Sequence, residues 1–461
     1  MHRLWEVIAG SSGSVAGAFC GRSASIALNE LGTASTFGAK LEQLRGRSVL
    51  LATHEQLATA AALVELDGVA RRLVLCTPDL TPDQLAGVAV AAAADVIVVD
   101  AAAARVSTLA LAHIESSALP TRGTLERRCS EDTEWVLLTS GTTGQPKLVS
   151  HTFESLAGAL PRQAAALNPV VWSTFYDIRR YGGLQIYLRA VLSGSSLVLS
   201  SGGESTHDFL ARAAALGVTH ISGTPSHWRR ALMSGEVALI SPQYVRLSGE
   251  VADQTVLDSL HAAFPGARVA HAFASTEAGV AFDVNDGLAG FPADLINDPK
   301  GSINMKVQNG TLWIRSGRTA ARYLGEAAPP LAGADGYVDT GDMVELEAGR
   351  FYFRGRKGGI INVGGLKVYP EEVESVLNAD PRVRMSRVTA RRNPLVGSLV
   401  VADVVLSQGA QTIDEASAAK LKSELLNACR RSLAAHKVPA QLRFVPALEM
   451  NAAGKLVRAG A

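Results

Sequence analysis

A loop rich in hydroxyl groups and glycine carries the strongest chemical signal in the sequence. It consists of Thr139, Ser140, Gly141, Thr142, Thr143, Gly144, Gln145, Pro146 and Lys147. Glycine lets the backbone bend around an anion, hydroxyl and N–H groups donate to phosphate oxygens, and the lysine adds a positive charge. The segment therefore predicts a phosphate-binding loop. A Walker loop needs Gly-Lys followed by Ser or Thr. Lys147 follows a proline and Gly454-Lys455 precedes Leu456, which opposes a P-loop kinase.

Three further polar segments follow apolar, β-branched runs that predict strands. They are Ser222-Gly223-Thr224, Ser248-Gly249-Glu250 and Ala274-Ser275-Thr276-Glu277. In open parallel sheets, ligands bind beyond the carboxyl ends of the strands. We therefore expect these three segments and the phosphate-binding loop to converge on one crevice.

The elements that must position these groups alternate between strands and helices. Predicted helices cover 54–69 and 82–94, the second capped by Thr81 with Pro82 at its first position. Predicted strands cover 49–52, 73–76, 96–99, 135–138, 220–221, 245–247 and 269–273. This order predicts an α/β fold whose parallel sheet is buried and flanked by helices.

The pattern changes from about Asn304 onward. Short strands at 311–315, 343–347 and 351–353 predict a small antiparallel or barrel-like unit. A basic, glycine-rich joint follows at 355–359. Beyond it, helices beginning at Pro370 and at Glu415 and strands at 387–390 and 399–406 predict a small α+β unit. We place the domain boundary at the joint, which gives a large N-terminal domain (1–357) and a small, mobile C-terminal domain (358–461).

Composition excludes several classes of protein. The 461 residues include 47% apolar and 19% charged residues with a net charge of +1, which indicates a globular chain and no nucleic-acid partner. The four cysteines form no CxxC pair, so neither a zinc knuckle nor a disulfide framework is indicated. Apolar runs are shorter than the ~18 residues of a membrane span. With no clear export signal in the sequence, we expect a cytoplasmic protein.

Taken together, the motifs resemble those of the adenylate-forming superfamily, which includes acyl-CoA synthetases, adenylation domains of non-ribosomal peptide synthesis, and firefly luciferase. The resemblance rests on the phosphate-binding loop, Ser248-Gly249-Glu250, residues 273–277, Thr340-Gly341-Asp342, residues 355–365 and residues 454–458. These pieces occur in the order typical of the family and extend from residue 139 to residue 458. The segment before residue 139 matches only in general character.

The resemblance implies a role for each matched residue in ATP binding. Residues 140–147 would surround the β and γ phosphates, Thr276 would bond the α-phosphate, and Glu277 would hold Mg²⁺. Asp342 would accept hydrogen bonds from the ribose hydroxyls, and Ser248, Gly249 and Glu250 would lie near adenine, beside Ala274 and Ser275. Arg356 would contact the nucleotide after domain closure. Lys455 would reach the crevice from the small domain, between the substrate carboxylate and the α-phosphate.

The resemblance also implies a second half-reaction, in which the small domain rotates about Gly358 and exchanges the lysine for a glycine loop. Gly364 and Gly365 belong to that loop and would let pantetheine pass. Several residues depart from the family pattern. Leu148 replaces a glycine after the loop lysine, Gly358 and Gly359 replace an acidic pair, and Asn362 replaces a lysine. These changes bear on the thioester step more than on adenylation.

The acyl pocket is expected among Arg180, Tyr181, Gly183, Ser222, Gly223, Thr224 and Phe273. Arg180 or Tyr181 falls where amino-acid-activating relatives carry an aspartate for the substrate ammonium, and a cation there would repel that group. We therefore disfavour α-amino acids, although Asp177 lies only three residues earlier. Arg180 could pair with a second acidic group on the substrate, but an ordinary structural contact with an aspartate is the stronger expectation.

The resulting prediction is an acid–thiol ligase of the acyl-CoA synthetase type, using ATP, Mg²⁺ and coenzyme A. It would convert an aryl, fatty or other non-amino acid into an acyl adenylate and then into a thioester, releasing pyrophosphate and AMP. The main alternative is an enzyme that loads an acyl or aminoacyl group onto the phosphopantetheine of a separate carrier protein. A catalytically inactive nucleotide-binding relative is the second alternative, which the presence of Lys455, Glu277 and Asp342 opposes.

Overall fold

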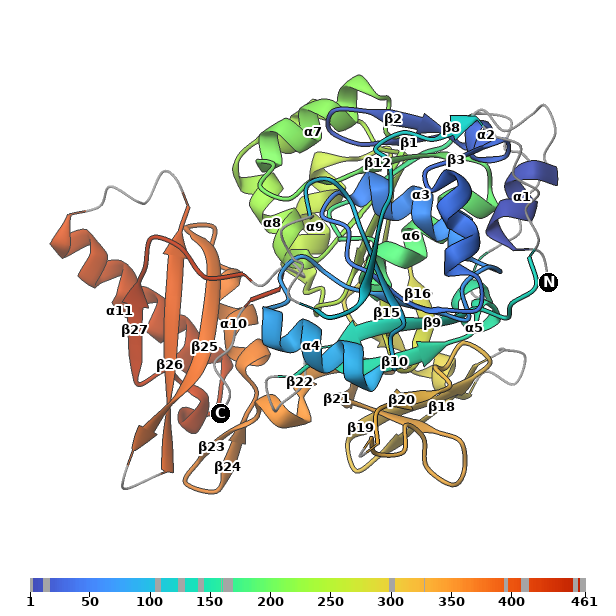
Figure 1. Cartoon of the computed structure of the whole chain (residues 1–461). Coiled ribbons are helices and arrows are strands. Elements are labelled where there is room, and N and C mark those ends of the chain that lie inside the picture. Colours follow the sequence, from blue (N-terminus) through green and yellow to red (C-terminus); the bar gives the residue numbers. More distant parts are fainter. Residues whose placement is uncertain are drawn as a thin grey trace.

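The computed structural model describes residues 3–10, 17–103, 109–122, 129–139, 145–158, 160, 169–297, 303–326, 328–393, 397–407, 414–450 and 455–456. The fold is mixed α/β, as predicted (Figure 1). Its helices are α1 (Leu4–Gly10), α2 (Leu28–Leu31), α3 (Gln56–Leu66), α4 (Pro82–Ala91), α5 (Phe153–Ala157), α6 (Tyr181–Leu192), α7 (Thr206–Ala215), α8 (Pro225–Met233), α9 (Gln254–Ala263), α10 (Pro370–Asn378) and α11 (Glu415–Ser432). Within the described ranges, no helix combines the length and the apolar character needed to cross a membrane.

A seven-stranded sheet contains the strands predicted in the first third of the chain. Its order is β20 (Arg322–Leu324), β10 (Lys147–His151), β9 (Glu134–Thr139), β5 (Arg72–Leu75), β4 (Ser48–Leu51), β6 (Val96–Val99) and β7 (Ala112–Glu115). The pairs from β9 through β7 are parallel, whereas β10 runs antiparallel to both of its neighbours. Thr81 caps α4 with a complete capping box and Pro82 in the first turn, which confirms that prediction.

An eight-stranded sheet contains the strands that precede the other polar segments. Its order is β16 (Gly279–Val284), β15 (Arg268–Ser275), β14 (Tyr244–Ser248), β13 (His220–Gly223), β11 (Val171–Thr174), β12 (Ser196–Leu199), β1 (Ala18–Cys20) and β2 (Ser25–Ala27). Strands β13, β14 and β15 are adjacent and parallel, so their carboxyl ends lie side by side. The four predicted loops therefore come from two sheets rather than one, since β9 belongs to the other sheet.

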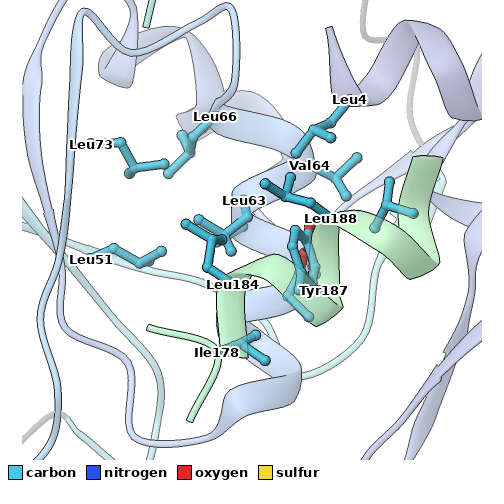
Figure 2. Packing of buried hydrophobic residues seen from close by; sticks show 14 of the residues in the cluster. Leu4, Leu51, Leu63, Val64, Leu66, Leu73, Ile178, Leu184, Tyr187 and Leu188 are labelled. Atoms are coloured by element: carbon cyan, nitrogen blue, oxygen red, sulfur yellow. The ribbon is translucent and has the colours of Figure 1, made fainter. Parts of the chain in front are cut away.

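Helices α3 and α6 contribute to the core that joins the two large sheets. One cluster of buried side chains includes Leu63 of α3, Leu184 of α6, Leu51 of the first sheet and Leu197 of the second (Figure 2). The Tyr187 hydroxyl donates to the Ala60 carbonyl at 2.9 Å, which ties the two helices together. Every residue of α3 is buried. The sheets therefore share one continuous apolar core.

Five strands between Phe291 and Arg356 form the predicted antiparallel unit. The order of this five-stranded sheet is β17 (Phe291–Pro292), β22 (Arg350–Arg356), β21 (Val338–Glu347), β19 (Thr311–Ser316) and β18 (Ile303–Gln308). All four pairings are antiparallel. Phe291, Phe351 and Phe353 pack together on one face, with ring centroids 5.4–5.5 Å apart. A two-stranded pair, β3 (Ala34–Ser35) with β8 (Thr121–Arg122), lies outside these sheets.

The described residues from Ile361 to Phe444 form an α+β unit with its own core. It contains the hairpin β23 (Ile361–Val363) and β24 (Leu366–Val368), and the sheet β25 (Val383–Asn393), β26 (Gly397–Leu406) and β27 (Gln441–Phe444). Helices α10 and α11 complete its apolar cluster, whose members all lie between Ile361 and Phe444. In Figure 1 this unit, drawn in orange and red, stands to one side of the large sheets. A domain boundary at 357/358 remains our proposal.

Candidate functional site

Lys455 lies against the carboxyl end of β14. Gly249, the first residue after that strand, has a φ of +86°, which disfavours any residue with a Cβ. A Cβ built on Gly249 would lie 3.4 Å from Cε and 3.7 Å from Nζ of Lys455, and 3.8 Å from Cγ2 of Thr224. The structure thus brings the tail lysine to two of the predicted polar segments, although more than 200 residues separate them in the chain.

The charges around Lys455 define a crevice with both signs of charge. Burial lowers the pKa of Lys455, whereas the carboxylates of Glu250 and Asp342 oppose that effect and Arg356 and Arg180 add to it. All four of these groups were predicted to line the nucleotide or acyl site. These four groups therefore lie within electrostatic range of the Lys455 amino group.

Asp342 and Arg356 face each other across the antiparallel strands β21 and β22. The residues are register partners, and the Arg356 Nε donates to the Asp342 Oδ1 at 3.1 Å. The Asp342 backbone N–H donates to the Thr340 hydroxyl oxygen at 3.1 Å, which fixes the turn. Burial raises the pKa of Asp342, opposed by the charge of Arg356. A carboxylate fixed in this way is suited to accept hydrogen bonds from sugar hydroxyl groups.

Glu277 and the phosphate-loop lysine meet at Tyr323. The Tyr323 hydroxyl donates to the Glu277 Oε1 at 3.2 Å, and the Lys147 Nζ lies 5.4 Å from the centroid of the Tyr323 ring. Tyr323 belongs to β20, which pairs with β10, the strand that Lys147 begins. Residues 140–144 lie outside the described residues. The Thr139 hydroxyl is buried and has no hydrogen-bond partner among the described residues, which leaves it available to a ligand.

His151 fixes the backbone of the Thr276–Glu277 pair. Its Nε2 donates to the Thr276 carbonyl at 2.7 Å, and its Nδ1 lies 2.9 Å from the Ser155 hydroxyl oxygen. Burial lowers the pKa of His151 to about 4, so the ring is neutral at pH 7. A neutral ring bonded to a carbonyl positions the loop without adding charge to it.

Glu250 and Thr224 are held at the start of α8. The Ser226 backbone N–H donates to the Glu250 Oε2 at 3.0 Å. Thr224 caps the helix in a reciprocal arrangement with His227, which stacks on Phe175 at 5.2 Å. These contacts hold the ends of β13 and β14 in a fixed relation.

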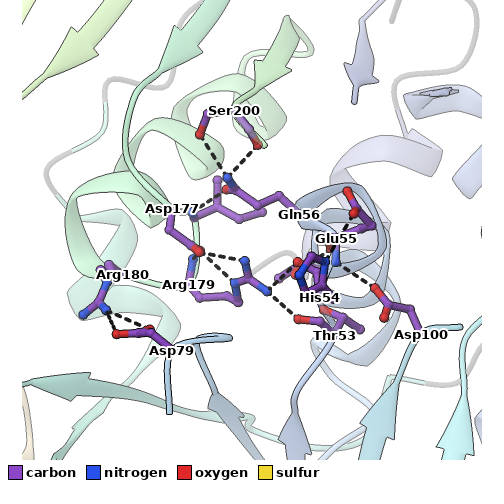
Figure 3. Close-up of polar contacts among 12 residues, drawn as sticks. Thr53, His54, Glu55, Gln56, Asp79, Asp100, Asp177, Arg179, Arg180 and Ser200 are labelled. Carbon is purple, nitrogen blue, oxygen red and sulfur yellow. Dashed lines mark hydrogen bonds and ion pairs between the residues drawn. The ribbon is translucent and has the colours of Figure 1, made fainter. Parts of the chain in front are cut away.

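The predicted acyl-pocket residues at the start of α6 make structural contacts. Arg180 donates to both carboxylate oxygens of Asp79 at 2.9 and 3.1 Å, the ordinary contact that the sequence favoured. Asp177 is bound at both oxygens by Arg179, which also donates to the Thr53 and His54 carbonyls (Figure 3). Asp177 is therefore committed to Arg179 and does not present a carboxylate to a substrate ammonium.

The other predicted pocket residues are distributed over α6, β13 and β15. Tyr181 is buried, and a Cβ on Gly183 would lie 2.2 Å from the Asp177 carbonyl oxygen, so this position admits only glycine. A Cβ on Gly223 would lie 2.7 Å from the Phe175 ring. Phe273 stacks on Phe353 at 5.0 Å, which links the end of β15 to the antiparallel sheet. Ser222 is fully buried.

The predicted thiol loop lies away from Lys455. Gly364 and Gly365 form the turn of the β23–β24 hairpin with φ of +57° and +86°. In Figure 1 this hairpin lies at the lower edge of the C-terminal unit, away from β15 and β16. Gly358 lies in a short 3-10 turn with no atom within 4 Å of a built Cβ. The structure brings the lysine to the crevice and leaves the glycine hairpin outside it.

The carboxylate of Glu277 is the predicted protein ligand for Mg²⁺ in this crevice. Among the described residues, no cluster of three or more His, Cys, Asp or Glu side chains could hold a metal ion. Glu277 still fits Mg²⁺, because this ion is usually bound by one or two carboxylates together with substrate phosphates and water. No motif singles out His151 or Tyr323 in the sequence, since their contacts with Thr276 and Glu277 depend on strand pairing.

Comparison with known families gives two matches. A model described as AMP-binding enzyme matches residues 49–324, and one described as AMP-binding enzyme C-terminal domain matches residues 372–455. The first model alone covers more than half of the chain.

Individual relatives agree with these matches. A medium/long-chain-fatty-acid–[acyl-carrier-protein] ligase of Mycobacterium tuberculosis is 27% identical over 72% of this chain and 66% of its own length. A 2-succinylbenzoate–CoA ligase of Geobacillus kaustophilus is 30% identical over 72% of this chain and 70% of its own. Among solved structures, an anthranilate CoA ligase, AuaEII, in complex with anthranoyl-AMP has a TM-score of 0.82 at 17% identity, over 99% of this chain and 95% of that one. The chain spans just under two thirds of the first relative's length.

Proposed function

Because the chain belongs to the family of AMP-binding, adenylate-forming enzymes, we propose that it activates a carboxylic acid with ATP and transfers the acyl group to the thiol of coenzyme A. The carboxylate oxygen attacks the α-phosphorus, and the bond to the β-phosphate oxygen breaks as pyrophosphate leaves. The thiol then attacks the acyl carbon, and AMP leaves. Relatives that carry CoA-ligase or carrier-protein-ligase names support acid activation and thioester formation.

The single observation that carries the proposal is the position of Lys455 against Gly249. Both the acid and ATP are anionic, so adenylation requires a positive charge between them and a fixed line of attack. A lysine from the tail supplies that charge as a point on a flexible stem. Glu250 and Asp342 favour its charged form, although it is buried.

The nucleotide occupies the ends of β13–β15 and the loop after β9. Residues 140–147 bind the β and γ phosphates, and Thr276 bonds the α-phosphate. When bound, Mg²⁺ neutralises phosphate charge beside Glu277. Ser248, Gly249, Glu250, Ala274 and Ser275 border the adenine, and Asp342 accepts the ribose hydroxyls, oriented by Arg356.

The thioester step uses a different surface of the small unit. Gly364 and Gly365 lie outside the crevice in the present arrangement, which is the one suited to adenylation. Rotation about Gly358 would remove Lys455 and bring in the glycine turn, where the absence of side chains admits pantetheine. Gly358 has room for such a change, since no atom crowds it.

An acid panel in ATP–pyrophosphate exchange tests the proposed function. Fatty, aryl and dicarboxylic acids are supplied singly with Mg²⁺, and AMP release is then measured with and without coenzyme A. We expect exchange with at least one class of non-amino acid and CoA-dependent AMP release with the same acid. Cleavage of ATP to ADP, or no exchange with any acid, would contradict the proposal.

A carrier protein is the alternative thiol donor, and the name of the M. tuberculosis relative favours it. Coenzyme A and a phosphopantetheinylated carrier protein are compared as acyl acceptors. A carrier-loading ligase would keep its acyl adenylate bound and release no AMP when CoA is added, yet it would acylate the carrier. AMP release with free CoA would support our proposal.

A further inference from the structure

A buried arginine lies on the face of β14 that looks toward α6. Arg246 is 3% exposed, and its Nη2 donates to the Asp283 Oδ1 at 2.7 Å. Its Nε is enclosed without a hydrogen-bond partner among the described residues. The neighbouring residues Val245 and Leu247 point to the opposite face, into the cluster under α7–α9. Arg246 is therefore not part of the apolar packing of that face.

A second arginine, Arg189 on α6, lies within electrostatic range of Arg246. Burial lowers the pKa of Arg189, and the positive charge of Arg246 lowers it further, opposed by Asp283. The Arg189 Nε is also enclosed and without a partner in the part of the chain that the structure describes. Arg246 is bonded to Asp283, and the same carboxylate acts electrostatically on Arg189. Enclosing a cation without enough acceptors is costly, so the pair is suited to receive an anionic group from a ligand.

The arginine pair is continuous with the Lys455 crevice. Arg246 and Ser248 are two residues apart on β14, roughly 7 Å along the strand. Tyr176 lies between the two sites, because its hydroxyl donates to the Ser248 carbonyl at 2.7 Å and its ring lies within electrostatic range of both Arg246 and Glu250. The nucleotide end and the arginine end therefore belong to one surface.

Small residues line the same side of the sheet as Arg246. Ala270 and Ala272 on β15 are the register partners of Arg246 and Ser248, so they point to the same side. On α6, Gly182 faces the Tyr176 ring, with a built Cβ 3.5 Å from it. Gly182 and Arg189 are partly exposed although most of α6 is buried. Solvent thus reaches the side of α6 that carries Arg189.

Resting on the proposed function, we propose that the substrate is a dicarboxylic acid, whose second carboxylate binds Arg246 and Arg189 while Lys455 faces the carboxylate that reacts. Arg246 lies three residues before Gly249, the residue beside Lys455. At about 3.3 Å per strand residue, the two carboxylates of the substrate would therefore lie roughly 7–10 Å apart. Arg180 does not serve this role, because Asp79 occupies it.

Matched acids test the proposal in ATP–pyrophosphate exchange. Adipate with hexanoate, and suberate with octanoate, differ only by a carboxylate in place of the terminal methyl group. We expect higher kcat/KM for the dicarboxylate of each pair. In Arg189→Gln the ratio of kcat/KM for the dicarboxylate over the monocarboxylate should fall by about 10- to 150-fold, the range for a hydrogen bond to a charged group. Arg430→Gln, exposed on α11, is the matched control and should leave the ratio unchanged.

Arg246→Gln gives a second test. If that variant fails to fold, Arg189→Gln still tests the proposal, because it leaves the Arg246–Asp283 pair intact. The proposal is overturned if the wild type uses the monocarboxylates at least as well, or if Arg189→Gln lowers both acids of a pair in parallel. If exchange occurs with monocarboxylates alone, the proposed acid-activating function is supported but the proposal of a dicarboxylic substrate is wrong. No exchange with any acid would reject both.

Discussion

The nucleotide side and the acyl side of the crevice are built in different ways. Glu250 and Thr276 lie just beyond strand ends, and Asp342 lies in β21 next to an irregularity in its pairing with β22. Backbone contacts such as Asp342 N–H to Thr340 and His151 to Thr276 fix their positions. Arg246 and Arg189 lie inside a strand and a helix. The difference teaches how our two proposals depend on the fold: the proposed nucleotide residues are held by backbone contacts, whereas the proposed acid-selecting residues are interior side chains.

The largest expected effect is on the nucleotide side. We expect Glu277→Gln to lower adenylation by about 10²–10³-fold, the range for removing one preorganised electrostatic group, and higher Mg²⁺ concentration to restore part of the loss. Pyrophosphate exchange against Mg²⁺ concentration measures this, with the exposed Glu415→Gln as control. An unchanged rate at low Mg²⁺ would mean that another group holds the ion.

The histidine that supports the nucleotide side predicts an acid-sensitive stability. The folded pKa of His151 is about 4, below the unfolded value of 6.5, so the unfolded chain binds the extra proton between these values. Stability is therefore complete above pH 6.5 and is lost as pH falls. Between pH 7 and pH 5 this group alone removes about 2 kcal/mol.

Urea unfolding of the wild type and His151→Gln at both pH values measures that loss. The variant should be less stable at pH 7 but should lose about 2 kcal/mol less on acidification. Equal losses in both proteins would show that His151 is not a buried neutral ring.

A smaller effect is expected where the two sides meet, at Gly249. Gly249→Ala forces a Cβ onto a residue with φ of +86° and pushes it toward Lys455. The strain costs about 1–2 kcal/mol, and we expect adenylation to fall by roughly tenfold for every acid, because 1.4 kcal/mol is a factor of ten. Gly266→Ala is the control, since its built Cβ meets nothing. Acid-dependent losses would instead place Gly249 on the acyl side.

The smallest effect is expected at the proposed hinge. Gly358→Ala should change stability by less than about 0.5 kcal/mol, because its φ is ordinary and its Cβ position is open. Gly365→Ala, at φ +86°, should cost about 1–2 kcal/mol. Thermal unfolding compares the pair, and equal losses would show that the two glycines are under the same backbone constraint.

Much of the fold could be predicted because it depends on local patterns. The α3 and α4 helices and strands β4–β6 lie within three residues of their predicted ends, since periodicity and the Thr81 cap are local signals. The separation of β9 from β13–β15 into another sheet could not be predicted. It depends on which distant strands pair and on the packing of α3 and α6 between the sheets.

The site divides in the same way. Thr276, Glu277 and Asp342 stand in motifs and could be identified from their neighbours in the chain. Tyr323 and His151 could not, because only strand pairing and packing bring them to Glu277 and Thr276. Arg246 and Arg189 resemble any other arginines until burial and orphaned nitrogens distinguish them.

Lys455→Ala provides the most direct test of the central claim that the tail lysine at the end of β14 makes adenylation possible. Pyrophosphate exchange should fall by about 10²–10³-fold, while ATP binding and the transfer of a supplied acyl adenylate to coenzyme A should persist. The exposed Lys420→Ala on α11 is the matched control. Exchange at the wild-type rate in Lys455→Ala would contradict the account.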